Sequence, residues 1–208
     1  MQEILINITP METRVALVEN GVPQEIHIER NNSRGLVGNI YKGKVVRVLP
    51  GMQAAFIDIG EARTAFLHVD DLVQRGKTDD SEPADIAHLL HEGQQIVVQV
   101  IKDPLGSKGA RLSAELSIAS HNLVYMPAAE HIGISQRIED EEERERLKST
   151  LVSVIDKLQP KGGYIVRTVA EGASEEELSS AVGFLSRVWD DLKERKVEAE
   201  APSCLYED

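Results

Sequence analysis

The sequence has 208 residues, of which 41% are hydrophobic and 28% charged, a composition typical of a folded globular protein rather than a disordered one. Its single cysteine, Cys204, excludes a disulfide framework and a thiolate zinc site, and favours a reducing cytoplasm. The start of the chain does not predict a signal peptide, and no run of ~18 apolar residues predicts a membrane span. The net charge of −12 disfavours nucleic acid as a partner of the whole chain. Whether one part of the chain can bind nucleic acid depends on the local distribution of charge.

Residues 3–30 predict a small antiparallel sheet. Ile4, Ile6 and Ile8 alternate with other residues, and Glu-Asn-Gly at 19–21 predicts a tight hairpin turn further along. Three strands of this kind make a sheet with one apolar face, which needs a cover for stability. Because no neighbouring segment supplies a cover, this face favours self-association into a homo-oligomer.

Residues 35–116 predict a five-stranded barrel. A polar insertion, 70–92, separates the third strand from the fourth, and its part 84–91 predicts a short helix. Five strands with a helix between the third and fourth is the order of an OB fold. The strands are expected at 38–49, 54–59, 65–68, 95–102 and 111–115.

Residues 117–196 predict a small α/β module, which makes the whole chain α+β. Two helices are expected to begin at side-chain caps, the first at Asp140 with Glu143 and the second at Ser174 with Glu177. Each helix carries an apolar stripe at helical spacing, and a strand at 164–168 lies between them. The stripes comprise Leu147, Leu151, Val154, Ile155 and Leu158 in the first helix, and Leu178, Ala181, Leu185, Val188, Trp189 and Leu192 in the second. The last residues predict a polar linker that ends without a stop signal.

Positive charge gathers in the barrel, whereas the acidic residues concentrate in the insertion and the two helices. A basic module within an acidic chain is the pattern of a protein that binds a polyanion, although an ordinary soluble surface gives the same pattern. The basic residues outside the insertion are Arg30, Arg34, Lys42, Lys44, Arg47, Arg63, Lys102, Lys108 and Arg111.

Two aromatic residues, Phe56 and Phe66, lie on strands joined by a short turn and are expected to be neighbours across that hairpin. Exposed rings on a barrel face stack on nucleobases, and Lys108 in the following glycine-containing loop can reach a phosphate beside them. The alternative is that both rings belong to the core, which is the commoner fate of phenylalanine in a strand.

Arg167 and Thr168 end the strand of the α/β module. An arginine fork and a hydroxyl can bind a phosphate together, but on the residues alone a strand-end salt bridge from Arg167 to one of the many nearby glutamates is the leading explanation. The histidines are interpreted as structural or surface residues, because His88 and His91 have no third ligand at zinc spacing. The acidic pairs at 70–71 and 79–80 are interpreted as solvated loops rather than magnesium sites.

Several collinear strings resemble the ribonuclease E/G family, and within it the G-type branch more than the longer E-type. They are Asn-Ile-Tyr-Lys-Gly-Lys at 39–44, Leu-Pro-Gly-Met-Gln-Ala-Ala-Phe-Ile-Asp-Ile-Gly at 49–60, Lys-Asp-Pro-Leu-Gly-Ser-Lys-Gly-Ala-Arg-Leu at 102–112, Ile-Ser-Gln-Arg-Ile-Glu at 134–139 and Ile-Val-Arg-Thr-Val-Ala-Glu-Gly at 165–172. Such a family member is an endoribonuclease of rRNA and tRNA processing and mRNA decay.

The resemblance implies a division of the chain into four parts. Residues 1–35 are strands of a ribonuclease-H-like subdomain whose other half lies later in the family's chain. Residues 36–118 are an OB-fold barrel that binds single-stranded RNA, and 119–197 are a sensor of the RNA 5′-monophosphate. Residues 198–208 are a truncated linker before the catalytic domain, which depends on magnesium and is followed by a zinc link between subunits.

The resemblance also implies which residues bind RNA, through the positions that match the family's motifs. Phe56, Phe66 and Lys108 match the RNA-contacting positions of the barrel. Arg167 and Thr168 match the phosphate-binding pair, and Val124 lies where the wall of that pocket forms. Ser120 departs from the glycine of the E-type branch, which puts its contact in doubt. The catalytic acidic residues and zinc cysteines have no counterpart, so the chain is expected to bind RNA and, without its catalytic half, not to cut it.

Two alternatives stay open at this point. One is a self-contained RNA-binding adaptor with an OB barrel and an acidic docking module. The other is a truncated and poorly folded gene product without activity.

Overall fold

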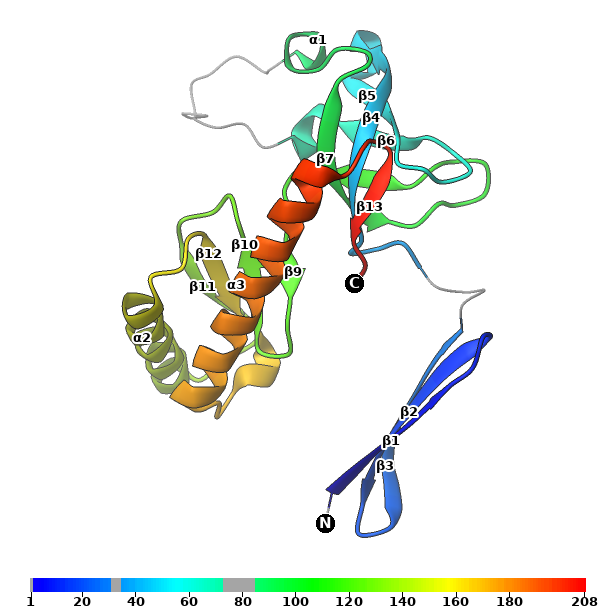
Figure 1. Cartoon of the computed structure of the whole chain (residues 1–208). Coiled ribbons are helices and arrows are strands. Elements are labelled where there is room, and N and C mark those ends of the chain that lie inside the picture. The colour runs from blue at the N-terminus through cyan, green and yellow to red at the C-terminus, as the bar shows by residue number, and fades with distance from the viewer. Residues whose placement is uncertain (1, 31–34, 73–84) are drawn as a thin grey trace. The chain divides into compact units, whose positions relative to one another are not determined.

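The computed structural model describes the chain except residue 1 and residues 31–34 and 73–84, and it contains two compact units, Met1–Leu36 and Val37–Asp208 (Figure 1). Arg34 lies outside the described residues. So does part of the expected insertion, including its acidic pair at 79–80. No helix among the described residues is long and apolar enough to cross a membrane.

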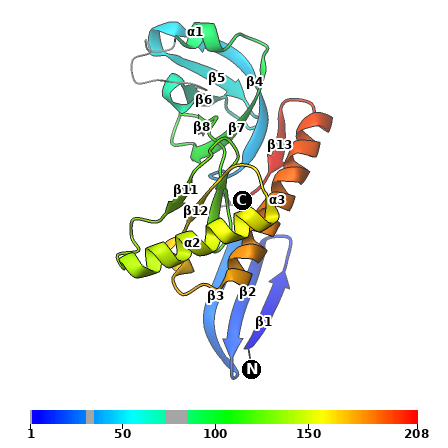
Figure 2. The ribbon, with the colours of Figure 1, turned by 90° about the vertical axis from the view of Figure 1, so that its left-hand side faces the viewer.

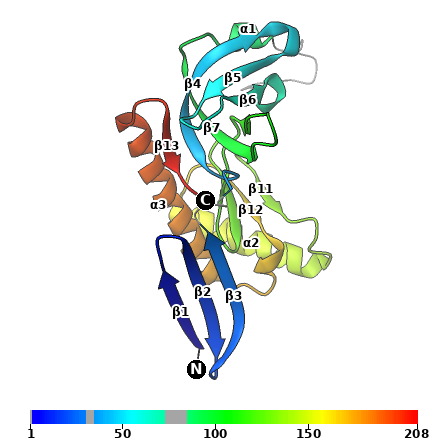
Figure 3. The same cartoon turned by 90° about the vertical axis from the view of Figure 1, so that its right-hand side faces the viewer.

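The first unit is an antiparallel sheet of β1 (Gln2–Ile8), β2 (Glu12–Glu19) and β3 (Val22–Arg30), in that order (Figure 3). Asn20 and Gly21 both have positive φ, as the tight turn requires. The expected single apolar face is wrong, because the register places exposed apolar residues on both faces. Ile6 lies opposite Val15 on one face, whereas Leu5 and Ile26 flank Ala16 on the other.

The second unit begins with the OB-like barrel that the sequence predicts. Its strand order is β4-β5-β6-β8-β7, and pairing of β7 with β4 closes the barrel (Figure 2). The inward residues of the strands, such as Val45, Ile57 and Leu112, are almost completely buried. The strand bounds are β4 Ile40–Leu49, β5 Ala54–Asp58, β6 Ala65–His68, β7 Gln95–Lys102 and β8 Arg111–Ser113, with short helices η2 Pro50–Met52, η3 Val69–Asp71 and α1 Ile86–Leu89.

The α/β module contains a four-stranded sheet rather than the single strand that the sequence predicts. The order is β11-β12-β10-β9, and the added strands have only two to four residues each, too few for a recognisable alternation. Thr168 lies in a 3-10 helix after the last of these strands. The bounds are β9 Ile118–Ala119, β10 Leu123–Met126, β11 Ile132–Ile134, β12 Gly163–Val166 and η4 Thr168–Ala170.

Helices α2 (Glu141–Leu158) and α3 (Glu175–Glu198) pack on this sheet. Both begin at the predicted N-cap residues, and Ser174 forms a complete capping box with Glu177. Asp140 accepts a hydrogen bond from Glu142 N–H, but its expected partner Glu143 binds Arg146 and Gly172 N–H instead. The predicted stripes supply much of the core, except that Leu158 is exposed.

The expected linker at 198–208 is wrong, because Ser203–Tyr206 form a strand, β13, that pairs antiparallel with the first residues of β4 (Figure 1). The side chain of Leu205 is buried in the core shared with the α/β module. Alternation over four residues is too short to predict a strand, and the polar composition of the segment indicates a linker.

Lys42 joins the barrel to the end of α3. Its ammonium donates to the carbonyl oxygens of Lys196 at 2.9 Å and Ala199 at 2.7 Å, at the negative end of the helix dipole. One of the basic residues expected on a polyanion-binding surface therefore serves the fold.

We expect Lys42→Met to lower the free energy of unfolding by about 1.5–3 kcal/mol, since charge-assisted hydrogen bonds are lost at a partly buried place. Urea denaturation of the whole chain measures the change. Lys44→Met, at an exposed position on the same strand, is the control; an equal loss in both variants would contradict a capping role for Lys42.

Candidate functional site

One row of outward side chains crosses all the strands of the barrel. Arg47 lies directly opposite Phe56, Phe56 opposite Phe66, Phe66 opposite Arg111, and Arg111 opposite Lys102. Because residues directly opposite on neighbouring strands share a face, the row places two rings between cations.

Phe56 and Phe66 form an edge-to-face pair with ring centroids 6.1 Å apart. Both side chains are partly exposed, whereas their neighbours Ile57 and Leu67 are fully buried. The strand alternation therefore turns the two rings away from the core and toward solvent.

The rings line a cavity of about 810 Å³, to which the loop before β8 contributes Lys108. A side chain at Gly109 would have its Cβ 2.0 Å from the carbonyl oxygen of Thr64, so only glycine lets this loop approach the hairpin so closely. The structure thus brings together the three barrel residues singled out in the sequence. The full lining is Met52, Phe56, Arg63, Thr64, Phe66, Ser107, Lys108, Gly109 and Arg111.

Three residues of this region were not singled out from the sequence as site residues. Arg63 donates to the carbonyl oxygen of Gly106 and so ties the hairpin turn to the Lys108 loop. Arg111 is held by Asp71, at 2.9 and 3.1 Å to one carboxylate oxygen, which partly neutralises its charge. The ring of His68 lies beside Phe66, with centroids 6.4 Å apart. Their positions depend on strand register and loop contacts, which the sequence does not display.

Arg167 and Thr168 lie at the end of β12, in the α/β module. One terminal nitrogen of Arg167, Nη1, donates to the carbonyl oxygens of Ser120 at 2.6 Å and His121 at 3.4 Å. The expected alternative, a salt bridge to glutamate, is not seen among the described residues. The Thr168 hydroxyl lies 3.0 Å from that of Ser135.

Val124 lies on β10, opposite Ile165 of β12, and is partly buried. Ser120 contributes its carbonyl oxygen to Arg167, while its hydroxyl donates to Leu123 O. The contact with Arg167 therefore uses the backbone of residue 120 and does not depend on its side chain.

A second set of contacts fixes the loop that follows η4. Glu143 of α2 accepts two hydrogen bonds from Arg146, at 2.6 and 2.7 Å, and one from the N–H of Gly172 at 2.8 Å. Arg146 in turn donates to the carbonyl oxygen of Ala173. The Arg146 guanidinium, followed by the Gly172 N–H, lowers the pKa of Glu143 from 4.5 to about 2.

We expect the thermal midpoint to fall as pH drops from 4.5 to about 2. A carboxylate with a lowered pKa in the folded state stabilises it above the unfolded pKa, and this contribution is lost as the pH passes through the folded pKa. Glu143→Gln should lower the midpoint at neutral pH and flatten the acid fall, as measured by calorimetry across this range. Exposed Glu145→Gln is the control, and an unchanged acid fall in Glu143→Gln would refute the assignment.

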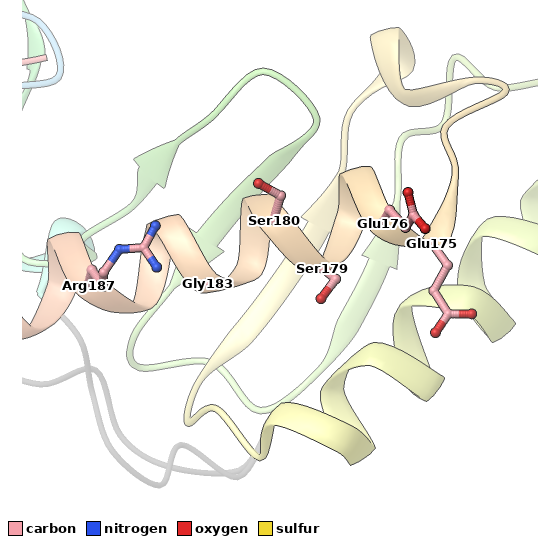
Figure 4. A pocket seen from close by; sticks show the side chains of 6 residues that line it. All are labelled: Glu175, Glu176, Ser179, Ser180, Gly183 and Arg187. Carbon is pink, nitrogen blue, oxygen red and sulfur yellow. The ribbon is translucent and has the colours of Figure 1, made fainter.

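A further hollow, of about 700 Å³, lies along the outer face of α3 (Figure 4). Small residues, Ser179, Ser180 and Gly183, leave the space between Glu176 and Arg187. The labelled side chains in Figure 4 point in different directions rather than toward one point, so they do not assemble a binding site. Within the described part of the chain, no group of three His, Cys, Asp or Glu residues is placed to hold a metal ion.

Known proteins are similar to almost the whole chain. A family model described as "Ribonuclease E/G family" matches residues 117–208. Ribonuclease G of Haemophilus influenzae is 52% identical and ribonuclease G of Escherichia coli K12 is 51% identical, each over 98% of this chain and 42% of the relative. Ribonuclease E of Haemophilus influenzae is 38% identical over 100% of the chain and 22% of the relative. The chain thus spans less than half the length of these relatives.

A solved structure titled "Crystal structure of a/eIF2alpha-aDim2p-rRNA complex from Pyrococcus horikoshii OT3" matches 79% of this chain and 87% of the solved one. The identity is 17% and the TM-score 0.30. We infer no property of this chain from a similarity this weak.

Proposed function

The chain belongs to the ribonuclease E/G family, and on this basis we propose that its barrel binds single-stranded RNA. The observation that carries the proposal is the partly exposed pair Phe56 and Phe66 beside Lys108, around one cavity. Aromatic rings stack on any base, and a cation beside them binds the backbone, which is the usual way in which OB folds hold single strands. The basic row of the barrel supports this proposal despite the acidic chain.

We further propose that Arg167 and Thr168 bind the 5′-monophosphate of the RNA, with Val124 in the wall of the pocket. The Nη1 atom of Arg167 is anchored on two carbonyl oxygens, so Nη2 and Nε keep donors for a phosphate in a fixed direction. The contact with Ser135 fixes the Thr168 hydroxyl in the same way.

The roles that depend on the rest of the family's chain are proposals as well. They are rRNA and tRNA processing and mRNA decay, carried out in the cytoplasm by a magnesium-dependent endoribonuclease. The exposed apolar residues on both faces of the β1-β2-β3 sheet support the proposal that this unit packs against another part of the family fold or a second copy.

Fluorescence anisotropy with labelled RNA tests barrel binding. We expect the 208-residue chain to bind a single-stranded octamer more tightly than the same strand in a duplex, because paired bases cannot reach the rings. Affinity should fall with salt as phosphate contacts are lost. Equal binding of both forms, or binding that Phe66→Ala leaves unchanged, would overturn the proposal.

A further inference from the structure

The row of outward residues on the barrel extends past the rings to Arg47, on the side away from Lys108. Arg47 lies on β4 directly opposite Phe56, so its Cβ is ~5 Å from that of the phenylalanine. Its side chain is exposed, and within the described ranges no hydrogen bond or ion pair holds the guanidinium.

An irregularity in β4 gives Arg47 this direction. Alternation from buried Val45 would point a residue two positions later into the barrel. The register between β4 and β5 instead shifts between Val45 and Arg47, because Val46 is an extra residue without a partner on β5. Such a bulge re-aims the following side chain, and here it places a charged residue outside.

Two other arginines, one in the row and one in the cavity lining, are engaged within the protein, whereas the side chains of Lys102 and Lys108 have no hydrogen bond or ion pair among the described residues. Arg111 is paired with Asp71, and Arg63 is bound to the carbonyl oxygen of Gly106. Lys42, earlier on β4, caps α3. Arg47 is therefore the arginine of the row that no contact within the described residues engages, and it lies directly opposite Phe56.

We infer that Arg47 binds a backbone phosphate of the RNA and extends the binding surface across the barrel from the Lys108 loop to β4. The inference rests on the proposed binding of single-stranded RNA by the barrel. A base stacked on Phe56 places its own sugar and phosphate within reach of a long side chain on the next strand, ~4.8 Å away. Lys108 at one end and Arg47 at the other then contact phosphates on both sides of the two stacked bases.

The test is the salt dependence of octamer binding by wild type, Arg47→Gln and Arg47→Lys. Losing one phosphate contact lowers the slope of log affinity against log salt by ~0.7, which corresponds to about a fivefold loss of affinity at 0.1 M salt. Arg47→Lys should keep the slope, because a phosphate contact needs the charge more than the fork. Exposed Arg187→Gln on α3 removes the same charge elsewhere in the same unit and should change the slope little.

An equal change in Arg47→Gln and Arg187→Gln would overturn the inference, since only the overall field would then matter. So would an unchanged slope in Arg47→Gln while Phe56→Ala still weakens binding. If neither Phe56→Ala nor Phe66→Ala weakens binding, the proposed function itself fails, and the two failures are thereby told apart.

Discussion

Phe56→Ala and Phe66→Ala should each weaken binding of single-stranded RNA by ~1–3 kcal/mol while leaving the thermal midpoint nearly unchanged. The expectation follows from the direction of the rings, which line the cavity and are partly exposed. A ring that does not fill the core leaves little void when it is removed, so its loss appears in binding rather than in stability.

The neighbouring residue Ile57 is the matched control. Its side chain comes from the same strand but is fully buried in the barrel, so Ile57→Ala should cost ~2–5 kcal/mol of stability. Melting curves and anisotropy titrations on the same preparations separate the two classes of residue. If Phe56→Ala instead lowered the free energy of unfolding by ~3–5 kcal/mol, both rings would belong to the hydrophobic core of the barrel.

The barrel was predictable because each strand carries enough residues to display its alternation. Strands 54–58, 65–68 and 95–102 begin where the glycine and proline signals place them. The neighbouring positions of Phe56 and Phe66 also followed from one short turn. The pairing of residues across a hairpin can be predicted from sequence because it depends only on the turn and the two strands beside it.

Features that join distant segments could not be predicted. Lys42 reaches the end of α3 across more than 150 residues, and its sequence neighbours give no sign of this partner. β13 exists because β4 offers it an edge, although its own residues resemble a linker. The outward direction of Arg47 depends on a bulge, and a single unpaired residue leaves no mark in composition or periodicity.

Arg167→Lys should abolish a preference for 5′-monophosphorylated RNA over 5′-hydroxyl and 5′-triphosphorylated RNA. In wild type the guanidinium donates to two carbonyl oxygens through Nη1, and Nη2 and Nε are the donors that we propose for the phosphate. An ammonium is a single point charge and cannot satisfy the carbonyls and enclose the phosphate with the same geometry. The expected loss for the monophosphate is ~1.5–3 kcal/mol.

The three RNA ends must be compared on one octamer sequence, so that barrel binding is common to all of them. A 5′-hydroxyl offers no charge to Arg167, and we expect a triphosphate to be too long to be enclosed by Arg167 and Thr168 as a monophosphate is. The variant should therefore bind all three ends alike, with the affinity that wild type has for the hydroxyl form. Arg137→Lys, at an exposed arginine of the same module, should keep the preference. If wild type binds the three ends equally while Phe66→Ala still weakens binding, the barrel binds RNA but Arg167 has no phosphate to hold, and its contacts with Ser120 and His121 serve the fold alone.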